Sequence, residues 1–255
     1  MLIIKDYMKR IILLFIVSIL FFTCSSDSNY KWFKGNLNEA MGICGNKIIL
    51  LDFYAKWWGA CNQLDADTFS DKNVIEFAKD NFLSIKVDVD DKNGYELFSK
   101  YMGSVMPTIL FLDSSGIEID RIIGYLPPDQ YQKRVIEITK KVNTISDYIA
   151  KYEKGQKTPE LLHSLGVKFY ERNNYIESKK YFNELLNNYS ELNIDLKSSA
   201  IYYLAYYDFG NGKIDKLVDF IDKFPESPFA MRAIFSIAKF YASQNNIVGE
   251  LEIYS

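Results

Sequence analysis

The chain has few of the residues that catalytic and metal centres use most often. Its 255 residues include 3 cysteines and one histidine, His163. That histidine lies on a predicted helix of the C-terminal half, which argues against a Cys–His or Ser–His–Asp set and against a histidine-rich zinc site. The acidic run 88–91 fails the calcium-loop register, because Val89 would take the first ligand position. With no glycine-rich phosphate loop either, we predict no metal and no cofactor.

A basic excess is also missing. Lys and Arg total 30 against 33 Asp and Glu, for a formal net charge of -3. Nucleic-acid binding needs a basic patch or stripe, so we exclude it as a main function. The composition is 48% hydrophobic and 25% charged, which is ordinary for globular protein. The length of 255 residues leaves room for one large domain or two modest ones.

The one long apolar run lies near the N-terminus, over Ile11–Phe22. It follows Lys9-Arg10 and is shorter than the roughly 20 residues of a comfortable membrane span, which favours a signal peptide. Cys24 and a serine-rich tether come next, as in a bacterial lipoprotein signal, whose cysteine is lipidated. We therefore expect residues 1–24 to direct export and Cys24 to anchor the protein at the cell envelope, facing the periplasm or the exterior. Plain secretion and an uncleaved anchor are the alternatives, and Met1 or Met8 is the start.

Two cysteines then remain for the folded part, Cys44 and Cys61. They flank a predicted strand of seven residues, which at ~3.3 Å each separates its ends by roughly 20 Å. Bridged Cα atoms lie within about 7 Å, so we predict no disulfide between them. Cys44 is expected to be a small buried residue near the end of a helix.

Helical and strand patterns alternate from Leu37 to Lys141. This order predicts a mixed sheet with helices on both faces, over 30–141. The predicted helices are Leu37–Cys44, Gly59–Asp67, Asp71–Asn81, Asn93–Met102 and one that starts at Pro127-Pro128, and the predicted strands are Ile48–Ala55, Phe82–Asp88, Thr108–Leu112 and Glu118–Ile123.

The C-terminal part shows only helical patterns, after a helical linker over 142–157. Residues 158–255 resemble tetratricopeptide repeats, in which Gly166 takes the place where paired helices approach closely. The small residues Gly166, Ala205 and Ala238 lie 39 and 33 residues apart, close to the usual period of about 34. An irregular helical bundle is the alternative. The other positions that carry the first repeat are Leu162, Leu165, Phe169, Ser178, Phe182 and Leu185.

The segment Trp57–Cys61 is the most informative in the chain. It follows a buried strand and opens a helix, as the motif Trp-Cys-Gly-x-Cys of dithiol redox proteins does, but Trp58 stands in place of the first cysteine. Residues 30–141 resemble a thioredoxin-like fold, closest to exported domains related to the C-terminal domain of the bacterial disulfide-interchange reductase. The resemblance rests on the segments 52–57, 68–74, 87–90 and 106–108, together with Cys61 and Gly124.

The resemblance gives several residues their expected roles. The first cysteine of the pair attacks and the second resolves the mixed disulfide. Cys61 occupies the second position, so a dithiol cycle cannot run within this motif. Asp52 matches the family's buried acid, a proton acceptor for Cys61; it could equally be an inherited buried acid with a shifted pKa.

The family also has a peptide-docking edge that needs no cysteine. Pro107 is expected to follow a cis peptide bond, which leaves the backbone of Met106 open to pair with an extended peptide. Trp57 and Trp58 would enlarge this apolar surface. The alternative is that one tryptophan packs into the domain and the other is half-exposed.

Three hypotheses about function follow. The first is a redox-degenerate module that binds proteins or peptides at the cell envelope. The second is an enzyme in which the single thiol of Cys61 works alone, helped by Asp52. The third is that Trp58 reflects a recent change or a sequence error, since Cys and Trp codons differ by one base.

Overall fold

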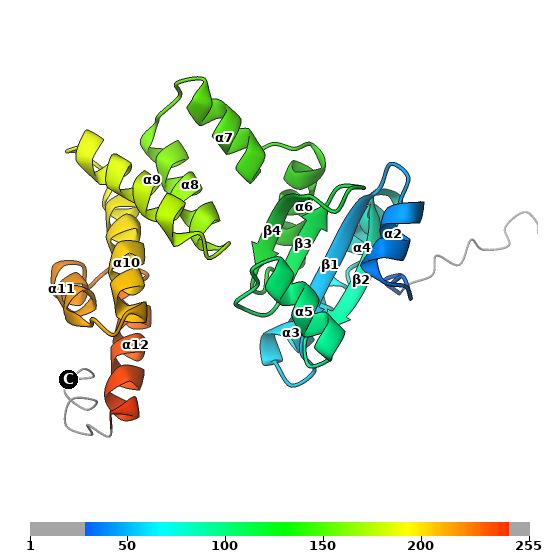
Figure 1. Ribbon diagram of the computed structural model, residues 1–255, viewed down its shortest axis with the longest axis horizontal. Helices are drawn as coiled ribbons and strands as arrows, with labels where there is room; N and C mark the ends of the chain where they lie inside the picture. The colour runs from blue at the N-terminus through cyan, green and yellow to red at the C-terminus, as the bar shows by residue number, and fades with distance from the viewer. Residues whose placement is uncertain (1–28, 245–255) are drawn as a thin grey trace, which may run out of the picture.

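The structure is a computed structural model that describes residues 29–244. The predicted signal peptide and Cys24 therefore lie outside the described residues. A part built around a sheet is followed along the chain by a part made of helices (Figure 1). Within 29–244 no helix is long and apolar enough to cross a membrane.

The sheet has four strands in the order β2-β1-β3-β4. β1 pairs parallel to β2 and antiparallel to β3, and β3 pairs antiparallel to β4, so the predicted mixed sheet is confirmed. Alternating or continuous apolar residues specify these strands, since side chains project to opposite faces in turn. The strands are β1 Ile48–Tyr54, β2 Phe82–Asp88, β3 Thr108–Leu112 and β4 Glu118–Ile123.

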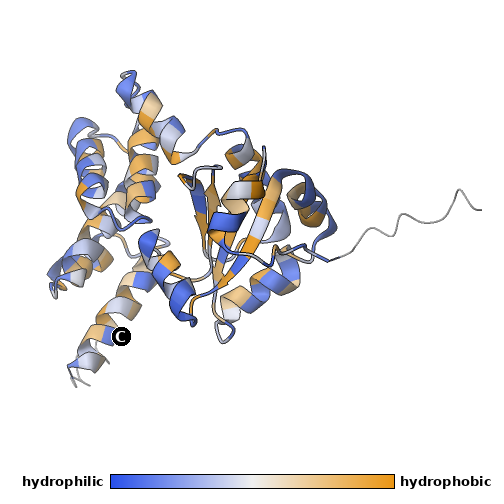
Figure 2. Cartoon of the chain, turned by 45° about the vertical axis from the view of Figure 1, so that its right-hand side comes forward, coloured by the Kyte–Doolittle hydropathy of each residue, from blue (hydrophilic) through white to orange (hydrophobic). Residues whose placement is uncertain are grey.

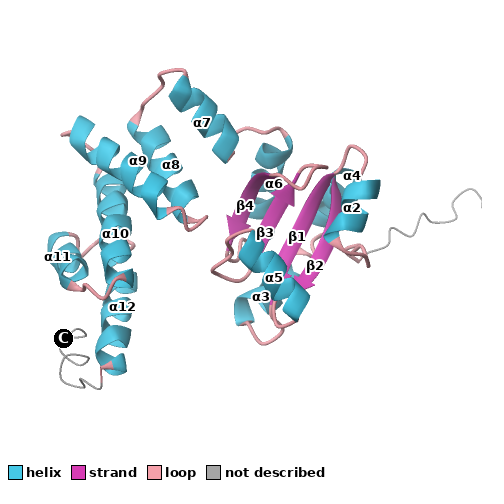
Figure 3. Cartoon of the chain, in the orientation of Figure 1, coloured by secondary structure: helices cyan, strands magenta, loops and turns pink. Residues whose placement is uncertain are grey.

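Helices cover both faces of the sheet, as Figure 3 shows. One face packs Leu50, Ile109 and Phe111 against α4 and α6. The other packs Leu51 and Leu110 against α2 and α5. The helices of this part are α2 Leu37–Ile43, α3 Gly59–Gln63, the π-helical turn η1 Leu64–Thr68, α4 Lys72–Asn81, α5 Lys92–Lys100 and α6 Pro128–Thr139.

Two of these helices differ from the sequence prediction by more than one residue. The helix expected over Gly59–Asp67 changes to a π-helical turn at Leu64, where the Phe69 amide donates to the Leu64 carbonyl at 2.9 Å. The helix expected to reach Met102 ends at Lys100. Met102 has a φ of 53°, which no α-helix of L-residues accommodates.

The C-terminal part is helical, as predicted. Orange and blue segments alternate along its helices in Figure 2, and the apolar side chains of these helices form two buried clusters. A Cβ on Gly166 would lie 2.5 Å from the Phe182 ring, so α8 and α9 approach each other as closely as the sequence suggested. The tetratricopeptide pattern itself stays a prediction. The helices are α7 Ile145–Glu153, α8 Pro159–Tyr170, α9 Tyr175–Asn188, α10 Ile194–Gly210, α11 Asp215–Lys223 and α12 Ala230–Ser243.

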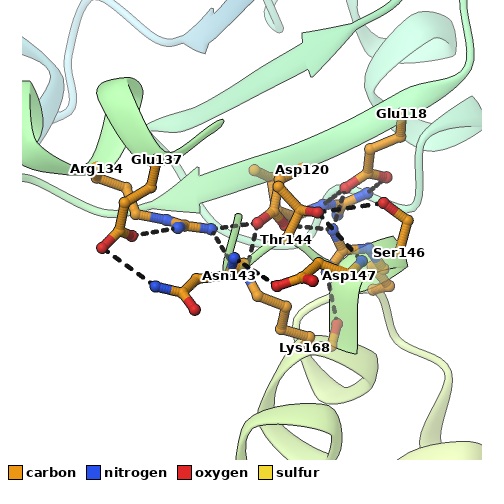
Figure 4. Close-up of polar contacts among 11 residues, drawn as sticks. Glu118, Asp120, Arg134, Glu137, Asn143, Thr144, Ser146, Asp147 and Lys168 are labelled. Atoms are coloured by element: carbon orange, nitrogen blue, oxygen red, sulfur yellow. Dashed lines mark hydrogen bonds and ion pairs between the residues drawn. The ribbon is translucent and has the colours of Figure 1, made fainter. Parts of the chain in front are cut away.

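A buried charge cluster joins the two parts along the edge strand β4. Asp120 on β4 is fully buried, and three cations converge on its carboxylate. Lys168 and Arg172, from α8 and its C-terminal turn, lie 2.7 and 2.8 Å from it, and Arg134 of α6 donates to it as well. Figure 4 shows Arg134 and Lys168 pointing toward Asp120. The helical part thus covers a sheet edge that would otherwise be open to pairing.

Candidate functional site

The sheet brings together two segments that are distant in the sequence, at one end of its two inner strands β1 and β3. β1 and β3 are antiparallel neighbours, and Phe53 near the end of β1 pairs with Thr108 at the start of β3. The segment that follows β1 therefore lies beside the loop that precedes β3. The first carries Trp57, Trp58 and Cys61, and the second carries Met106 and Pro107, the predicted docking residues.

The loop has the predicted backbone geometry, since the Met106–Pro107 peptide bond is cis. Pro107 is buried and Met106 half-buried, whereas Val105 just before them is 47% exposed. The Pro107 carbonyl accepts from the Gly124 amide at 2.8 Å. The cis-proline loop is thus fixed on its β4 side and presents an apolar residue to solvent.

Both tryptophans are exposed. Trp57 is 65% and Trp58 41% exposed, so the alternative that one of them packs into the domain is wrong. Their rings lie edge to face with centroids 5.6 Å apart, and the Trp57 indole donates to an Asp90 carboxylate oxygen at 3.0 Å. The contact fixes Trp57 while leaving most of its surface in water. An ordered pair of exposed indoles is a typical protein-binding feature.

Trp58 occupies the N-cap position of α3, with extended backbone angles. The amides of Cys61 and Asn62 donate to its carbonyl at 3.0 and 3.2 Å. This is the place where a helix N-terminus would stabilise a thiolate, as the resemblance implied. An indole there has no thiol to activate.

Cys61 is buried, with 2% of its surface exposed. Burial raises the pKa of its thiol above the ordinary value, which disfavours the reactive thiolate. Cys44 is the C-cap residue of α2 and is buried as well. Both Cys44 and Cys61 are free thiols in the described part of the chain.

Asp52 lies on β1 and is 1% exposed. Its burial raises the pKa of the carboxyl group to about 7, although the Lys86 ammonium 3.8 Å away opposes the shift. One of its oxygens has no hydrogen-bond partner among the described residues. Asp52 is therefore a buried acid that titrates near neutral pH, whether or not it serves Cys61.

Sequence reasoning missed Lys86 as a member of this site. Lys86 pairs with Asp52 in the β1–β2 register, forms an ion pair with Asp65, and lies over the Trp32 and Tyr54 rings at 5.2 and 4.7 Å. In the sequence it is one polar residue of an alternating strand. Only the strand register places it opposite the buried acid.

The titration of Asp52 gives a testable pH dependence. The pKa is about 7 in the folded chain and 3.8 for the free group, so between these values the folded state holds a proton that the unfolded state has lost. We expect this group to lower the free energy of unfolding by roughly 1.4 kcal/mol per pH unit as pH rises from 4 to 7, with no further change above. Asp52→Asn should remove that decline. Urea denaturation at pH 5 and pH 8 measures it, and parallel curves for the two proteins would contradict it.

The acidic run after β2 does not form a metal site. In the part of the chain that the structure describes, no group of three or more His, Cys, Asp and Glu side chains is placed to hold a metal ion. Asp88 ends β2 and pairs with Lys56 at 3.0 Å. Asp91 is the N-cap residue of α5, but its side chain makes no capping hydrogen bond.

Together these features define a class of protein. A mixed sheet, a cis-proline loop, and beside it a helix N-terminus with a buried cysteine one turn in are the architecture of a thioredoxin-like domain. Residues 37–138 match the family model described as a thioredoxin-like domain.

The sequence comparisons agree with the fold. Thioredoxin-1 of Caenorhabditis elegans is 30% identical over 114 residues, which cover 45% of this chain and 92% of that protein. The chain belongs to the thioredoxin family. The thiol:disulfide interchange protein DsbD of Photorhabdus laumondii subsp. laumondii is 32% identical over 107 residues, covering 41% of this chain and 19% of DsbD. The predicted relationship to disulfide-interchange proteins is confirmed, although the chain spans less than a fifth of those relatives.

Solved structures are similar as well. A putative disulphide-isomerase from Bacteroides thetaiotaomicron is 27% identical, with a TM-score of 0.40, and the match covers 43% of this chain and 93% of that one.

Proposed function

We propose that this thioredoxin-family protein binds extended protein segments at the edge formed by Trp57, Trp58, Met106 and Pro107, without a dithiol cycle. The observation that carries the proposal is the exposed Trp58 indole at the N-cap of α3, where the resemblance places an attacking thiol. The cysteine that remains is buried and its pKa is raised, which argues against a single-thiol enzyme. The apolar surface beside the cis-proline loop thus has a use that needs no redox chemistry.

Charges near the tryptophans indicate the kind of segment that would bind. Asp90 holds the Trp57 indole, and Asp88 lies two residues before it, with Lys56 as its ion-pair partner. Asp67 accepts from the Tyr125 hydroxyl on the η1 side of the site. Exposed indole faces also attract cations. We infer an apolar, extended ligand with basic residues at its ends.

A cysteine-free peptide tests this function. The probe is a six-residue peptide that has Lys at both ends and alternating Leu and Val between them. Its counterpart carries Glu at both ends. We expect the Lys probe to bind the native chain more tightly than the Glu probe, and Trp58→Ala to weaken its binding about tenfold, as for a central aromatic contact. Fluorescence anisotropy of the labelled peptides measures both differences.

The control is Ile194→Ala, which removes an equally apolar side chain that is 62% exposed on α10. It should leave the affinity unchanged. Equal binding by the native chain and Trp58→Ala would contradict the proposed site.

The placement of the protein in the cell is part of the proposal. The relationship to disulfide-interchange proteins and the apolar run before Cys24 support export, and the cysteine after that run supports a lipid anchor. A radiolabelled fatty acid fed to cells that express the full chain should appear in the native protein and be absent from Cys24→Ser. Equal labelling of both proteins would contradict the anchor at Cys24.

A further inference from the structure

The helical part contacts the loop that leads to the docking edge. This loop runs from Tyr101, just after α5, to the cis-proline. The Asn173 side-chain amide, in the turn between α8 and α9, donates to the Met102 carbonyl at 2.9 Å. The Arg121 guanidinium donates to the Tyr101 carbonyl at 2.8 Å and to the Glu171 carbonyl at 3.1 Å. The Met102 carbonyl is thus held directly by the helical part, and the Tyr101 carbonyl is held by Arg121 of β4, which also binds the helical part.

These contacts fix a backbone conformation that the loop does not prefer on its own. Met102 has a φ of 53°, an unusual value for a side chain other than Gly, Asn or Asp. The next amide, of Gly103, donates to the Phe98 carbonyl at 2.9 Å and closes the end of α5. Only three residues, 104–106, then separate this anchored turn from Pro107. A shift of Met102 is therefore transmitted directly to Val105 and Met106.

The turn that holds the loop is itself firmly placed. Arg172, within the same turn, binds the buried carboxylate of Asp120, and Lys168 of α8 binds it one helical turn earlier. Such buried, mutually satisfied charges tolerate little displacement, because separating them leaves uncompensated charge in a low-dielectric interior. The helical part is a rigid reference for the loop.

We propose that the helical part positions the cis-proline docking segment, with Asn173 as the positioning residue that holds the Met102 carbonyl. The proposal rests on the proposed function for its binding consequence, whereas its structural consequence can be measured without any ligand. In this arrangement the two parts of the chain form one functional unit. The sheet part supplies the docking edge, and the helical part sets the shape of that edge.

Asn173→Asp removes the contact while keeping the size of the side chain, and the charge that it adds is matched in the control variant. Asp tolerates the φ of 54° at this position, and it keeps the oxygen that accepts from the Tyr175 hydroxyl at 2.8 Å. It loses the amide donor to Met102. The matched control is Asn174→Asp in the same turn, because the Asn174 oxygen caps α9 by accepting from the Glu177 amide and Asp caps equally well.

Hydrogen–deuterium exchange of the full chain measures how well the amides of this loop are protected. We expect the amides of Met102 and Gly103 to exchange about fivefold faster in Asn173→Asp than in the native chain, the size expected for one lost hydrogen bond, and to be unchanged in Asn174→Asp. The same variant should bind the Lys probe about fivefold more weakly while its melting temperature matches that of the control.

The two readouts separate the possible failures. Unchanged exchange in Asn173→Asp would overturn the positioning role, whatever the probe does. Faster exchange with unchanged probe affinity would also overturn it, since the loosened loop would not control docking. If the native chain fails to bind the probe, the proposed function is wrong. Faster exchange that is limited to Asn173→Asp would still show that the turn between α8 and α9 holds the Met102 loop in place.

Discussion

The Trp58→Cys variant should reduce insulin in the presence of dithiothreitol, whereas the native chain should not rise above the background rate. Position 58 is the N-cap of α3, where the amides of a helix N-terminus stabilise a thiolate, and Cys61 lies one turn further. The new thiolate would attack an insulin disulfide, Cys61 would displace the reduced insulin thiol, and dithiothreitol would reduce the resulting disulfide. We expect turnover well above that of the native chain, because the variant restores the activated nucleophile that the native site lacks.

Two controls isolate the role of the thiol. Trp58→Ser removes the same indole without adding a thiol and should stay at background. Trp58→Cys combined with Cys61→Ala should hold the mixed disulfide with insulin when dithiothreitol is left out, because no resolving thiol remains in the chain. Turnover by the native chain comparable to that of Trp58→Cys would instead show that Cys61 works alone, and it would refute the binding function as proposed.

Asp120→Asn should lower the free energy of unfolding by about 3–5 kcal/mol, as expected when one partner of a buried ion pair is removed. The substitution keeps the shape of the side chain but leaves Arg134, Lys168 and Arg172 around a neutral amide. Burial already lowers the pKa of Lys168, which the carboxylate of Asp120 opposes. Urea denaturation followed by circular dichroism measures the loss.

Asp219→Asn, on the exposed side of α11, is the matched control and should change the free energy of unfolding by less than about 0.5 kcal/mol. A loss below about 1 kcal/mol in Asp120→Asn, the range of a surface ion pair, would mean that the cluster is solvated and does not clamp the two parts together.

Strand periodicity and helix signals predicted the sheet part closely. β2, β3 and β4 begin and end at the predicted residues, because each is a short apolar or alternating run between turn residues. The helix predicted to start at Asp71 is α4, and the Asp71 side chain caps its N-terminus. The local sequence did not predict η1, because the expected α-helix over Gly59–Asp67 widens into a π-helical turn at Leu64–Thr68.

The candidate site was only partly predictable. Trp57, Trp58, Cys61 and Pro107 could be found because the motif and the family resemblance fix their positions along the chain. The exposure of both tryptophans could not, since it depends on how this segment lies against the rest of the domain, including the Trp57 contact with Asp90, 33 residues away. Lys86 was missed for the same reason, because only strand register places it beside Asp52.

The sequence by itself determined the fold class of the sheet part, the helical character of the C-terminal part and the loss of the attacking thiol at position 58. These are local properties, carried by periodicity and by the identity of one residue. The tertiary structure alone decided that Asp120 is buried and that the turn after α8 holds the Met102 carbonyl. From the sequence alone, Glu118–Ile123 is an edge strand whose charged side chains would be expected to lie in solvent. Their burial arises from contacts about 50 residues apart in the chain, which no local pattern encodes.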